Sequence, residues 1–183
     1  MSRKLILAMF VSLDGYIAGP GGEFVPPPWS DDVARESPEW ASENGGHILY
    51  GRVNFEFNKA FWTTNEAKGM PETPFMTDTA KSVASRTLKG DLGWKGHAVA
   101  DLAAEVARLK AQPGKDILSF GGAGVAHSLI EQDLPDEYRL MITPSLLGGG
   151  LRLFPDGVRR DLELVESKAL DVGSLIVRYA RKR

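Results

Sequence analysis

A glycine-rich turn between a strand-like run and a helical pattern is the feature that most constrains the fold of this chain. Residues 117–120 read Ile-Leu-Ser-Phe, residues 121–124 read Gly-Gly-Ala-Gly, and apolar residues recur at helical spacing from Val125 onward. Glycine lets the backbone approach a ligand closely, and the unpaired amides of a helix N-terminus carry a partial positive charge. The pattern predicts a phosphate cradle at the carboxyl end of a strand. A structural turn without a ligand is the alternative.

Strand and helix signals alternate along the rest of the chain. Ser30 is expected to cap a helix, and the segment 69–74 is expected to be a loop. The expected strands are 5–11, 47–50, 81–85, 117–120 and 138–143. The further expected helices are 52–60, 102–109 and 123–132. The runs 162–170 and 174–180 predict a terminal β-hairpin. This order favours an α/β fold with a mainly parallel central sheet, an antiparallel C-terminal hairpin and helices on both faces.

Length and composition limit the classes of function. With 183 residues and neither a linker nor a repeat, we expect a single domain over 1–183. The formal net charge of −2 provides no basic surface for nucleic acid, and no run reaches the roughly 20 apolar residues of a membrane span. The chain lacks cysteine, which excludes a disulfide and a thiol nucleophile. Its three histidines lack ligand spacing, so we expect no metal site, and we expect a cytoplasmic protein.

Four segments at predicted strand ends, taken in order, resemble the dihydrofolate reductase superfamily. They are 10–19, 48–56, 83–88 and 120–124, and the stretches 136–140, 144–150 and 153–154 extend the likeness over almost the whole chain. The most similar branch contains the C-terminal reductase domain of the bifunctional riboflavin-biosynthesis deaminase-reductase. Each motif is short, and their ordered co-occurrence carries the resemblance. It implies a three-layer dihydrofolate reductase-like fold.

The resemblance also implies that NADPH is the cofactor. Gly51 would admit the cofactor backbone, Arg52 and Asn54 would meet its phosphates, and Ser85 and Arg86 would meet the ribose 2′-phosphate. A guanidinium beside hydroxyl donors suits a dianionic phosphate, so NADPH is favoured over NADH. For each arginine alone, an ordinary surface position is the alternative. The full set of implied cofactor residues is Ser12, Gly51, Arg52, Val53, Asn54, Ser85, Arg86, Gly121, Gly122, Ala123, Gly124 and Val125.

One cofactor segment departs from the family pattern. Asn54 and Phe55 stand where this branch more often has threonine and an aromatic hydroxyl. Asn54 retains a hydrogen-bond donor, whereas Phe55 has none. We therefore expect Phe55 to pack.

Two aspartates are candidates for the residue that delivers a proton during reduction. Asp32 lies in the first turn of the helix after Ser30, where dihydrofolate reductase has a carboxylate that binds and helps protonate the pterin; a helix-capping role is the alternative. Asp14 belongs to an Asp-Gly pair. Its carboxylate could either bond neighbouring amides of a turn or contact the substrate. A desolvated carboxylate here would have a raised pKa and could donate near neutral pH. Asp32 is the preferred candidate.

These observations predict an NADPH-dependent oxidoreductase that reduces a small heterocyclic substrate. The resemblance favours a ribosylamino-pyrimidine reductase of riboflavin biosynthesis. A pterin or dihydrofolate-type reductase and a non-catalytic nucleotide-binding member of the fold are the alternatives. The resemblance also implies a homodimer, for which the apolar Leu146-Leu147 pair gives the sequence's own support. Neither nucleic acid nor membrane is expected as a partner.

Overall fold

A nearly continuous apolar run forms the central strand of the sheet, as expected of a strand that is covered on both faces. In the computed structural model, which describes residues 2–182, β1 (Leu5–Ser12) lies between and parallel to β7 (Asp116–Ser119) and β8 (Glu137–Thr143). Parallel pairing continues from β7 through β3 (Gly45–Gly51) and β4 (Lys81–Ala84) to β6 (Gly96–Val99). The carboxyl ends of these strands therefore share one edge of the sheet.

Antiparallel strands complete the sheet at both sides. β11 (Leu175–Arg181) pairs with β8, and β10 (Leu162–Ala169) pairs with β11, which confirms the predicted C-terminal hairpin. At the other side, β5 (Asp91–Gly93) pairs with β6. The strand order is β10-β11-β8-β1-β7-β3-β4-β6-β5, and β2 (Tyr16–Ala18) forms a separate ladder with β9 (Leu151–Arg152).

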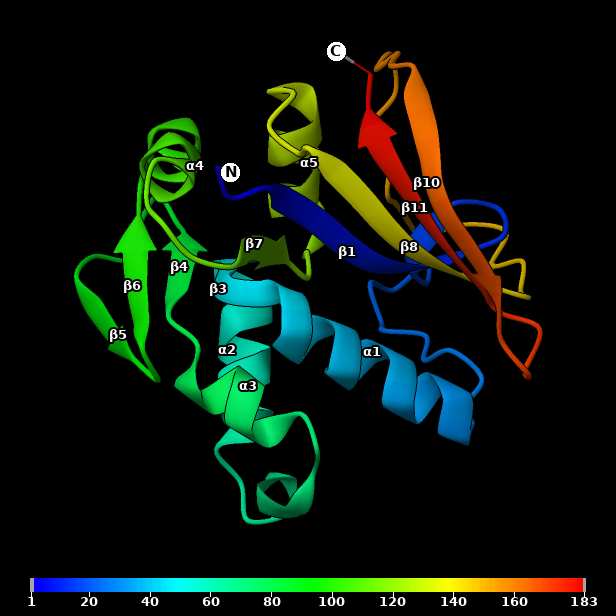
Figure 1. Ribbon diagram of the computed structural model, residues 1–183, viewed down its shortest axis with the longest axis horizontal. Helices are drawn as coiled ribbons and strands as arrows, with labels where there is room; N and C mark the ends of the chain where they lie inside the picture. Colours follow the sequence, from blue (N-terminus) through cyan, green and yellow to red (C-terminus); the bar gives the residue numbers. More distant parts are fainter. Residues whose placement is uncertain (1, 183) are drawn as a thin grey trace.

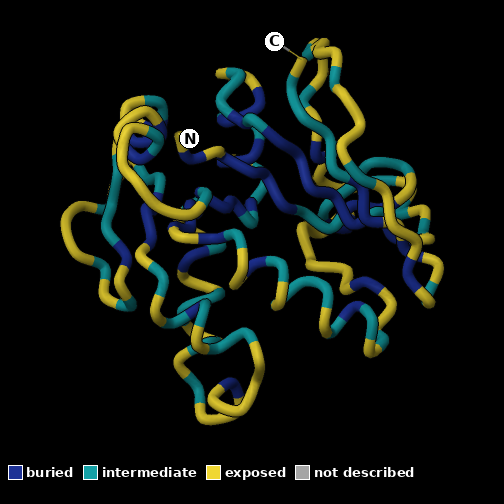
Figure 2. The backbone as a smooth tube through the Cα atoms, in the orientation of Figure 1, coloured by how far each residue is buried: buried dark blue, intermediate teal, exposed yellow. Residues whose placement is uncertain are grey.

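Helices cover both faces of the sheet (Figure 1). One face carries α1 (Asp31–Asn44), α2 (Arg52–Trp62), the 3₁₀ helix η1 (Ala67–Gly69) and α3 (Thr73–Asp78), and the other carries α4 (Leu102–Lys110) and α5 (Ala123–Glu131). The alternation along β1 explains this, because Leu5 and Leu7 pack in the cluster of α4 and α5, whereas Ile6 packs toward α1. Figure 2 shows the buried residues concentrated in the central strands. The predicted α/β layering is confirmed.

The main differences from the sequence expectation are α3 and the hairpin of β5 and β6. α3 begins inside 69–74, which was expected to be a loop, because Pro74 occupies the first helical turn, where its missing N–H costs nothing. The hairpin of β5 and β6 was not predicted, since neither strand has an apolar alternation of useful length. Its turn instead uses positive φ angles at Trp94 and Lys95, of 52° and 55°.

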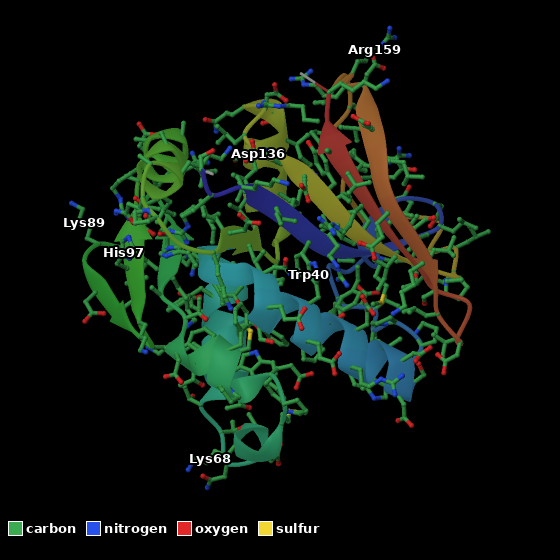
Figure 3. All side chains as sticks on the ribbon, in the orientation of Figure 1. Trp40, Lys68, Lys89, His97, Asp136 and Arg159 are labelled. Atoms are coloured by element: carbon green, nitrogen blue, oxygen red, sulfur yellow. The ribbon has the colours of Figure 1, made fainter. Side chains whose placement is uncertain are left out.

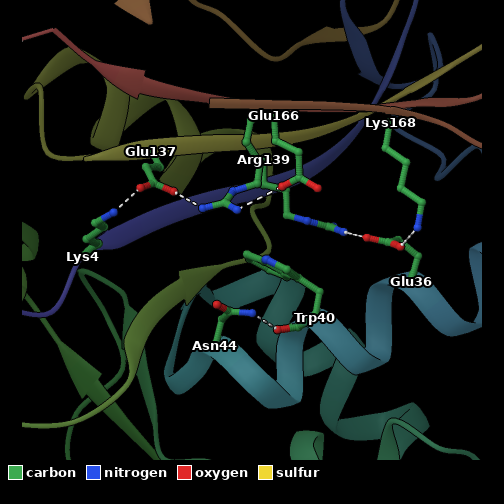
Figure 4. A network of polar contacts seen from close by, with 9 residues as sticks. Lys4, Glu36, Trp40, Asn44, Glu137, Arg139, Glu166 and Lys168 are labelled. Carbon is green, nitrogen blue, oxygen red and sulfur yellow. Dashed lines mark hydrogen bonds and ion pairs between the residues drawn. The ribbon is translucent and has the colours of Figure 1, made fainter. Parts of the chain in front are cut away.

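A buried ion pair ties α1 to the sheet (Figure 4). The Arg139 guanidinium, on β8, lies over the Trp40 ring at 4.2 Å and donates to Glu36 of α1 at 3.2 Å. Its side chain is only 6% exposed. Burial lowers the pKa of Arg139, and the Glu36 carboxylate opposes that shift. Lys168 of β10 pairs with the same carboxylate from the solvent side.

A second polar cluster lies under α4, in the half of the sheet toward the strand N-termini. Ser82 is fully buried, and its hydroxyl joins His47 at 2.7 Å to the Glu105 carboxylate. Arg108 donates twice to Glu105, and His97, labelled in Figure 3, reaches the same carboxylate at 3.3 Å. Burial lowers the pKa of His47 to about 4, and the hydrogen bond from Arg108 is the main cause that lowers the pKa of Glu105 to about 2.

Acidification is therefore expected to destabilise the protein through His47. The unfolded chain binds a proton near pH 6.5, which the folded state accepts only near pH 4. The free energy of unfolding is thus unaffected by His47 above pH 6.5. It falls by about 3 kcal/mol in total as the pH decreases from 6.5 to 4. Denaturant unfolding at a series of pH values measures this, and His47→Gln should flatten the curve between pH 6.5 and 4. An unchanged pH dependence in that variant would contradict the assignment.

Candidate functional site

The segments predicted to bind the cofactor begin at neighbouring strand ends. Ser12 ends β1, Gly51 ends β3, Ser85 follows β4, and Gly121 follows β7 after one intervening residue. Since these strands are parallel and lie in the order β1-β7-β3-β4, all four segments meet at one edge of the sheet. Open α/β sheets bind ligands at this edge.

Two helices begin at this edge without a side-chain cap. The N-cap residues of α2 and α5 are Gly51 and Gly122, whereas Ser30 and Asp101 cap α1 and α4 with their side chains. In α5, the amide of Ala126 bonds to the carbonyl of Gly122, so the amides of residues 123–125 precede the helical bonding pattern. Uncapped amides and the helix dipole favour an anion, which suits the predicted role of this turn.

The turn that joins β7 to α5 depends on glycine and on Asn54. Gly121 and Gly122 have φ angles of +81° and +70°, and a Cβ at Gly121 would overlap the Met9 thioether. The Asn54 side-chain amide donates to the carbonyls of Phe120 and Gly121 at 3.2 and 3.0 Å. Asn54 therefore holds the turn, and its donors are engaged there rather than free for the phosphate contact that the resemblance implies. Sequence reasoning missed this bond, because its partners are about 66 residues away.

The N-termini of α2 and α5 pack closely against each other. A Cβ at Gly51 would lie 3.5 Å from the Cβ of Val125, which is buried. Val125 thus contributes packing and a backbone amide, whereas Val53 presents a side chain that is 69% exposed. Phe55 is buried against Trp94, with a ring separation of 5.6 Å, which confirms the expected packing role.

The two arginines of the predicted cofactor site differ in their partners. Arg52 is exposed and pairs with Glu56 at 3.1 Å, one helical turn along α2. Arg86 is also exposed, and it makes no ion pair or hydrogen bond with any residue in the range 2–182. Ser85 lies beside it, and the Ser85 hydroxyl accepts from the amides of Thr87 and Leu88. A phosphate would meet Arg86 directly, but Arg52 would first have to release Glu56.

Asp14 joins the loop after β1 to the loop after β8. Its carboxylate accepts from the Ser12 hydroxyl at 2.6 Å and from the amides of Leu147 and Gly148 at 3.1 and 2.8 Å. These hydrogen bonds, that from Ser12 foremost, lower the pKa of Asp14 to about 2. The carboxylate is therefore ionised near neutral pH. The expectation that Asp14 has the raised pKa of a proton donor is wrong. The Ser12 hydroxyl also accepts from the amide of Tyr16.

A pocket opens between the ends of β1 and β8, beside this loop. Its lining is apolar or hydroxyl-bearing and includes no charged side chain: Phe10, Val11, Ser12, Tyr16, Ile17, Val25, Thr143, Ser145 and Leu147. Asp32 is not part of this lining. It pairs with Arg35, one helical turn along the surface of α1, and the helix is capped instead by the Ser30 hydroxyl, which also donates to Asp171. The expectation that Asp32 faces the pocket is thus not met.

Among residues 2–182, no three histidines, aspartates or glutamates are placed to hold a metal ion. In the same range, no helix combines the length and the apolar character that crossing a membrane requires.

Comparison with known proteins identifies the family. The model of the RibD C-terminal domain matches residues 3–176. The chain belongs to the RibD C-terminal domain family. Among curated sequences, it is similar to the uncharacterized protein YyaP of Bacillus subtilis strain 168, with 32% identity over 97% of this chain and 94% of YyaP. The uncharacterized protein YwjB of the same strain is 28% identical over 84% of each chain.

Solved structures confirm that RibD-type reductase domains share this fold. A putative riboflavin biosynthesis protein from Shewanella sp. PV-4 superposes with a TM-score of 0.73 at 24% identity, over 99% of this chain and 100% of that one. A diaminohydroxyphosphoribosylaminopyrimidine deaminase/5-amino-6-(5-phosphoribosylamino)uracil reductase from Thermotoga maritima gives a TM-score of 0.69 at 14% identity. The present chain covers 57% of that two-activity protein and 58% of Acinetobacter baumannii RibD, for which the TM-score is 0.63 at 18% identity.

Proposed function

We propose that this protein is an NADPH-dependent reductase of a small heterocyclic substrate. Its activity would be most similar to that of the ribosylamino-pyrimidine reductases of riboflavin biosynthesis. We also propose that it acts in the cytoplasm as a homodimer. The observation that carries the proposal is the convergence of two uncapped helix N-termini on the glycine turn after β7. Membership of the RibD C-terminal domain family supports the reductase class.

The residues at the carboxyl edge fit the chemistry of NADPH. The amides at the start of α2 and α5 would hold the pyrophosphate, with Ala123 and Gly124 contributing backbone only. Ser85 and Arg86, with Arg52 beyond them, would hold the 2′-phosphate. When bound, NADPH supplies the hydride, and the protein contributes position and exclusion of water. The loop that begins at Ser12 would cover the nicotinamide.

The neutral pocket beside that loop would receive only a polar edge of the substrate, because its volume of about 10 Å³ is that of about one water molecule. Its hydroxyl groups can hydrogen-bond such an edge or a water molecule. Because Asp14 is ionised and Asp32 lies outside the lining, we propose that a water molecule in this pocket delivers the proton. A pterin reductase with a carboxylate donor is the competing assignment.

Replacement of Asp32 by asparagine tests the source of the proton. If water delivers it, Asp32→Asn should keep NADPH affinity and turnover of a ribosylamino-pyrimidine within about threefold, because the ion pair with Arg35 contributes little at the surface. Steady-state NADPH oxidation across pH measures both. A fall in turnover of roughly 10²–10⁴-fold, with altered pH dependence, would restore Asp32 as the general acid.

Replacement of Arg86 by alanine tests the cofactor. Loss of a charge-assisted contact to the 2′-phosphate should weaken NADPH binding about tenfold to a hundredfold and leave NADH binding nearly unchanged. Calorimetric titration with both nucleotides measures the difference. Arg159→Ala, which removes an exposed arginine at a distant point of the molecule (Figure 3), is the matched control. Equal losses for both nucleotides would reject the assignment of Arg86, and binding without turnover would favour a non-catalytic protein.

A further inference from the structure

A second cavity lies at the opposite edge of the sheet from the candidate cofactor site. Its volume is about 110 Å³, and its lining consists of Ile130, Tyr138, Phe154, Val158, Arg160 and Leu162. α5 runs away from the cofactor edge and brings Ile130 there near its C-terminus, and Tyr138 stands at the amino end of β8. Figure 1 shows α5 beside the start of β8. None of the lining residues belongs to the site described above.

The walls of this cavity suit a small apolar body. The Phe154 and Tyr138 rings are 5.9 Å apart and tilted by 54°, and three aliphatic side chains complete the wall. Phe154 is 41% exposed although it packs on Tyr138, so the cavity has an apolar rim. Engineered apolar cavities of about 150 Å³ bind benzene, which places this cavity in the range of one small ring or branched chain.

The polar end of the cavity has unused hydrogen-bond donors. Tyr138 is only 4% exposed, yet its hydroxyl makes no hydrogen bond with any residue in the range 2–182. Unlike the buried and unpaired Tyr50 hydroxyl, the Tyr138 hydroxyl keeps contact with solvent, so it is free to donate to a ligand that enters the cavity. Arg160 donates through Nε to Asp133 at 3.0 Å and through Nη1 to a backbone carbonyl, and within the same range its Nη2 has no partner.

The local charge favours an anion as that ligand. Asp133 pairs with both Arg160 and Arg181, each at 3.0 Å. One carboxylate thus serves two guanidinium groups, and one positive charge remains without a counter-charge in this group of three. Guanidinium and phenol donors together match the two oxygens of a carboxylate.

We propose that this cavity binds a small monocarboxylate whose apolar body is about the size of a benzene ring. The ring packs against Phe154, Ile130 and Leu162, and the carboxylate accepts hydrogen bonds from the Tyr138 hydroxyl and the Arg160 guanidinium. This site is separate from the nucleotide edge and does not depend on the proposed reductase function.

Titration of the full chain with benzoate, followed by two-dimensional amide NMR, tests the proposal. Saturable shifts are expected around Ile130, Tyr138 and the segment 154–162, with a dissociation constant of about 10 mM or lower for a ligand of this size. Benzamide, which has a similar shape and no charge, should bind at least about tenfold more weakly, because the charge-assisted bond is lost.

Variants separate this cavity from other sites on the surface. Tyr138→Phe and Arg160→Gln should each weaken benzoate about tenfold, whereas Arg159→Gln, one residue from Arg160 and outside the lining, should not. Leu162→Trp should fill the cavity and abolish binding, with the unfolding midpoint as the check on folding. NADPH affinity should be unchanged in Tyr138→Phe. Shifts confined to the cofactor edge, no saturation, or equal affinity in Tyr138→Phe and Arg160→Gln would overturn the proposal.

Discussion

Replacement of Gly122 by valine is expected to weaken NADPH binding more than a hundredfold. Gly122 is the N-cap of α5 and has φ and ψ angles of +70° and 136°, a sparsely populated conformation that costs a side-chain-bearing residue about 1–3 kcal/mol. A branched side chain here would stand beside the uncapped amides, and relief of the strain would turn those amides away from the pyrophosphate. Fluorescence titration with NADPH measures the loss.

Gly157→Val is the matched control for this experiment. Gly157, in the loop between β9 and β10, has a comparable φ angle of +82°, and a Cβ added there would meet no atom within 4 Å. A valine there would also have a positive φ angle, but at a position in the loop after β9 rather than at the cofactor edge. Both variants should unfold at lower denaturant concentration, and only Gly122→Val should lose NADPH. Wild-type affinity in a folded Gly122→Val protein would return the glycine run to a purely structural role.

Replacement of Glu36 by leucine is expected to destabilise the fold by about 3 kcal/mol. The variant would leave the buried Arg139 guanidinium without its hydrogen-bonded carboxylate, while stacking on Trp40 persists (Figure 4). An unpaired buried charge is costly, because the interior cannot replace its hydration. Urea unfolding at neutral pH gives the change in the free energy of unfolding.

Two further variants show whether this cost comes from the buried charge. Lys168, the solvent-side partner of Glu36, has a side chain that is 47% exposed. Lys168→Met should therefore lower the free energy of unfolding by less than about 1 kcal/mol. The double variant Glu36→Leu/Arg139→Met should recover much of the stability lost in Glu36→Leu, because an apolar pair replaces the buried ion pair. If the stability losses of Glu36→Leu and Arg139→Met simply add in the double variant, the buried ion pair is not the source of the effect.

The sequence alone determined which segments meet at the candidate site. Apolar runs followed by glycine, serine or aspartate mark strand ends, so Gly51, Ser85 and Gly121 could be placed before the fold was known. The cap at Ser30 and the C-terminal hairpin are equally local, since turn chemistry and spacing fix them within a few residues. Parallel topology then requires these strand ends to share one edge.

Only the tertiary structure decided what the individual side chains do there. Asn54 binds the turn after β7, and Asp14 binds the loop after β8, across separations of 67 and 134 residues that no local pattern reveals. Asp32 pairs with Arg35 outside the pocket, and the unpaired Tyr138 hydroxyl is recognisable only when α5, β8 and β10 enclose it. Local spacing fixes where a backbone begins and ends an element, whereas the partner of a polar side chain depends on which distant segment folds against it.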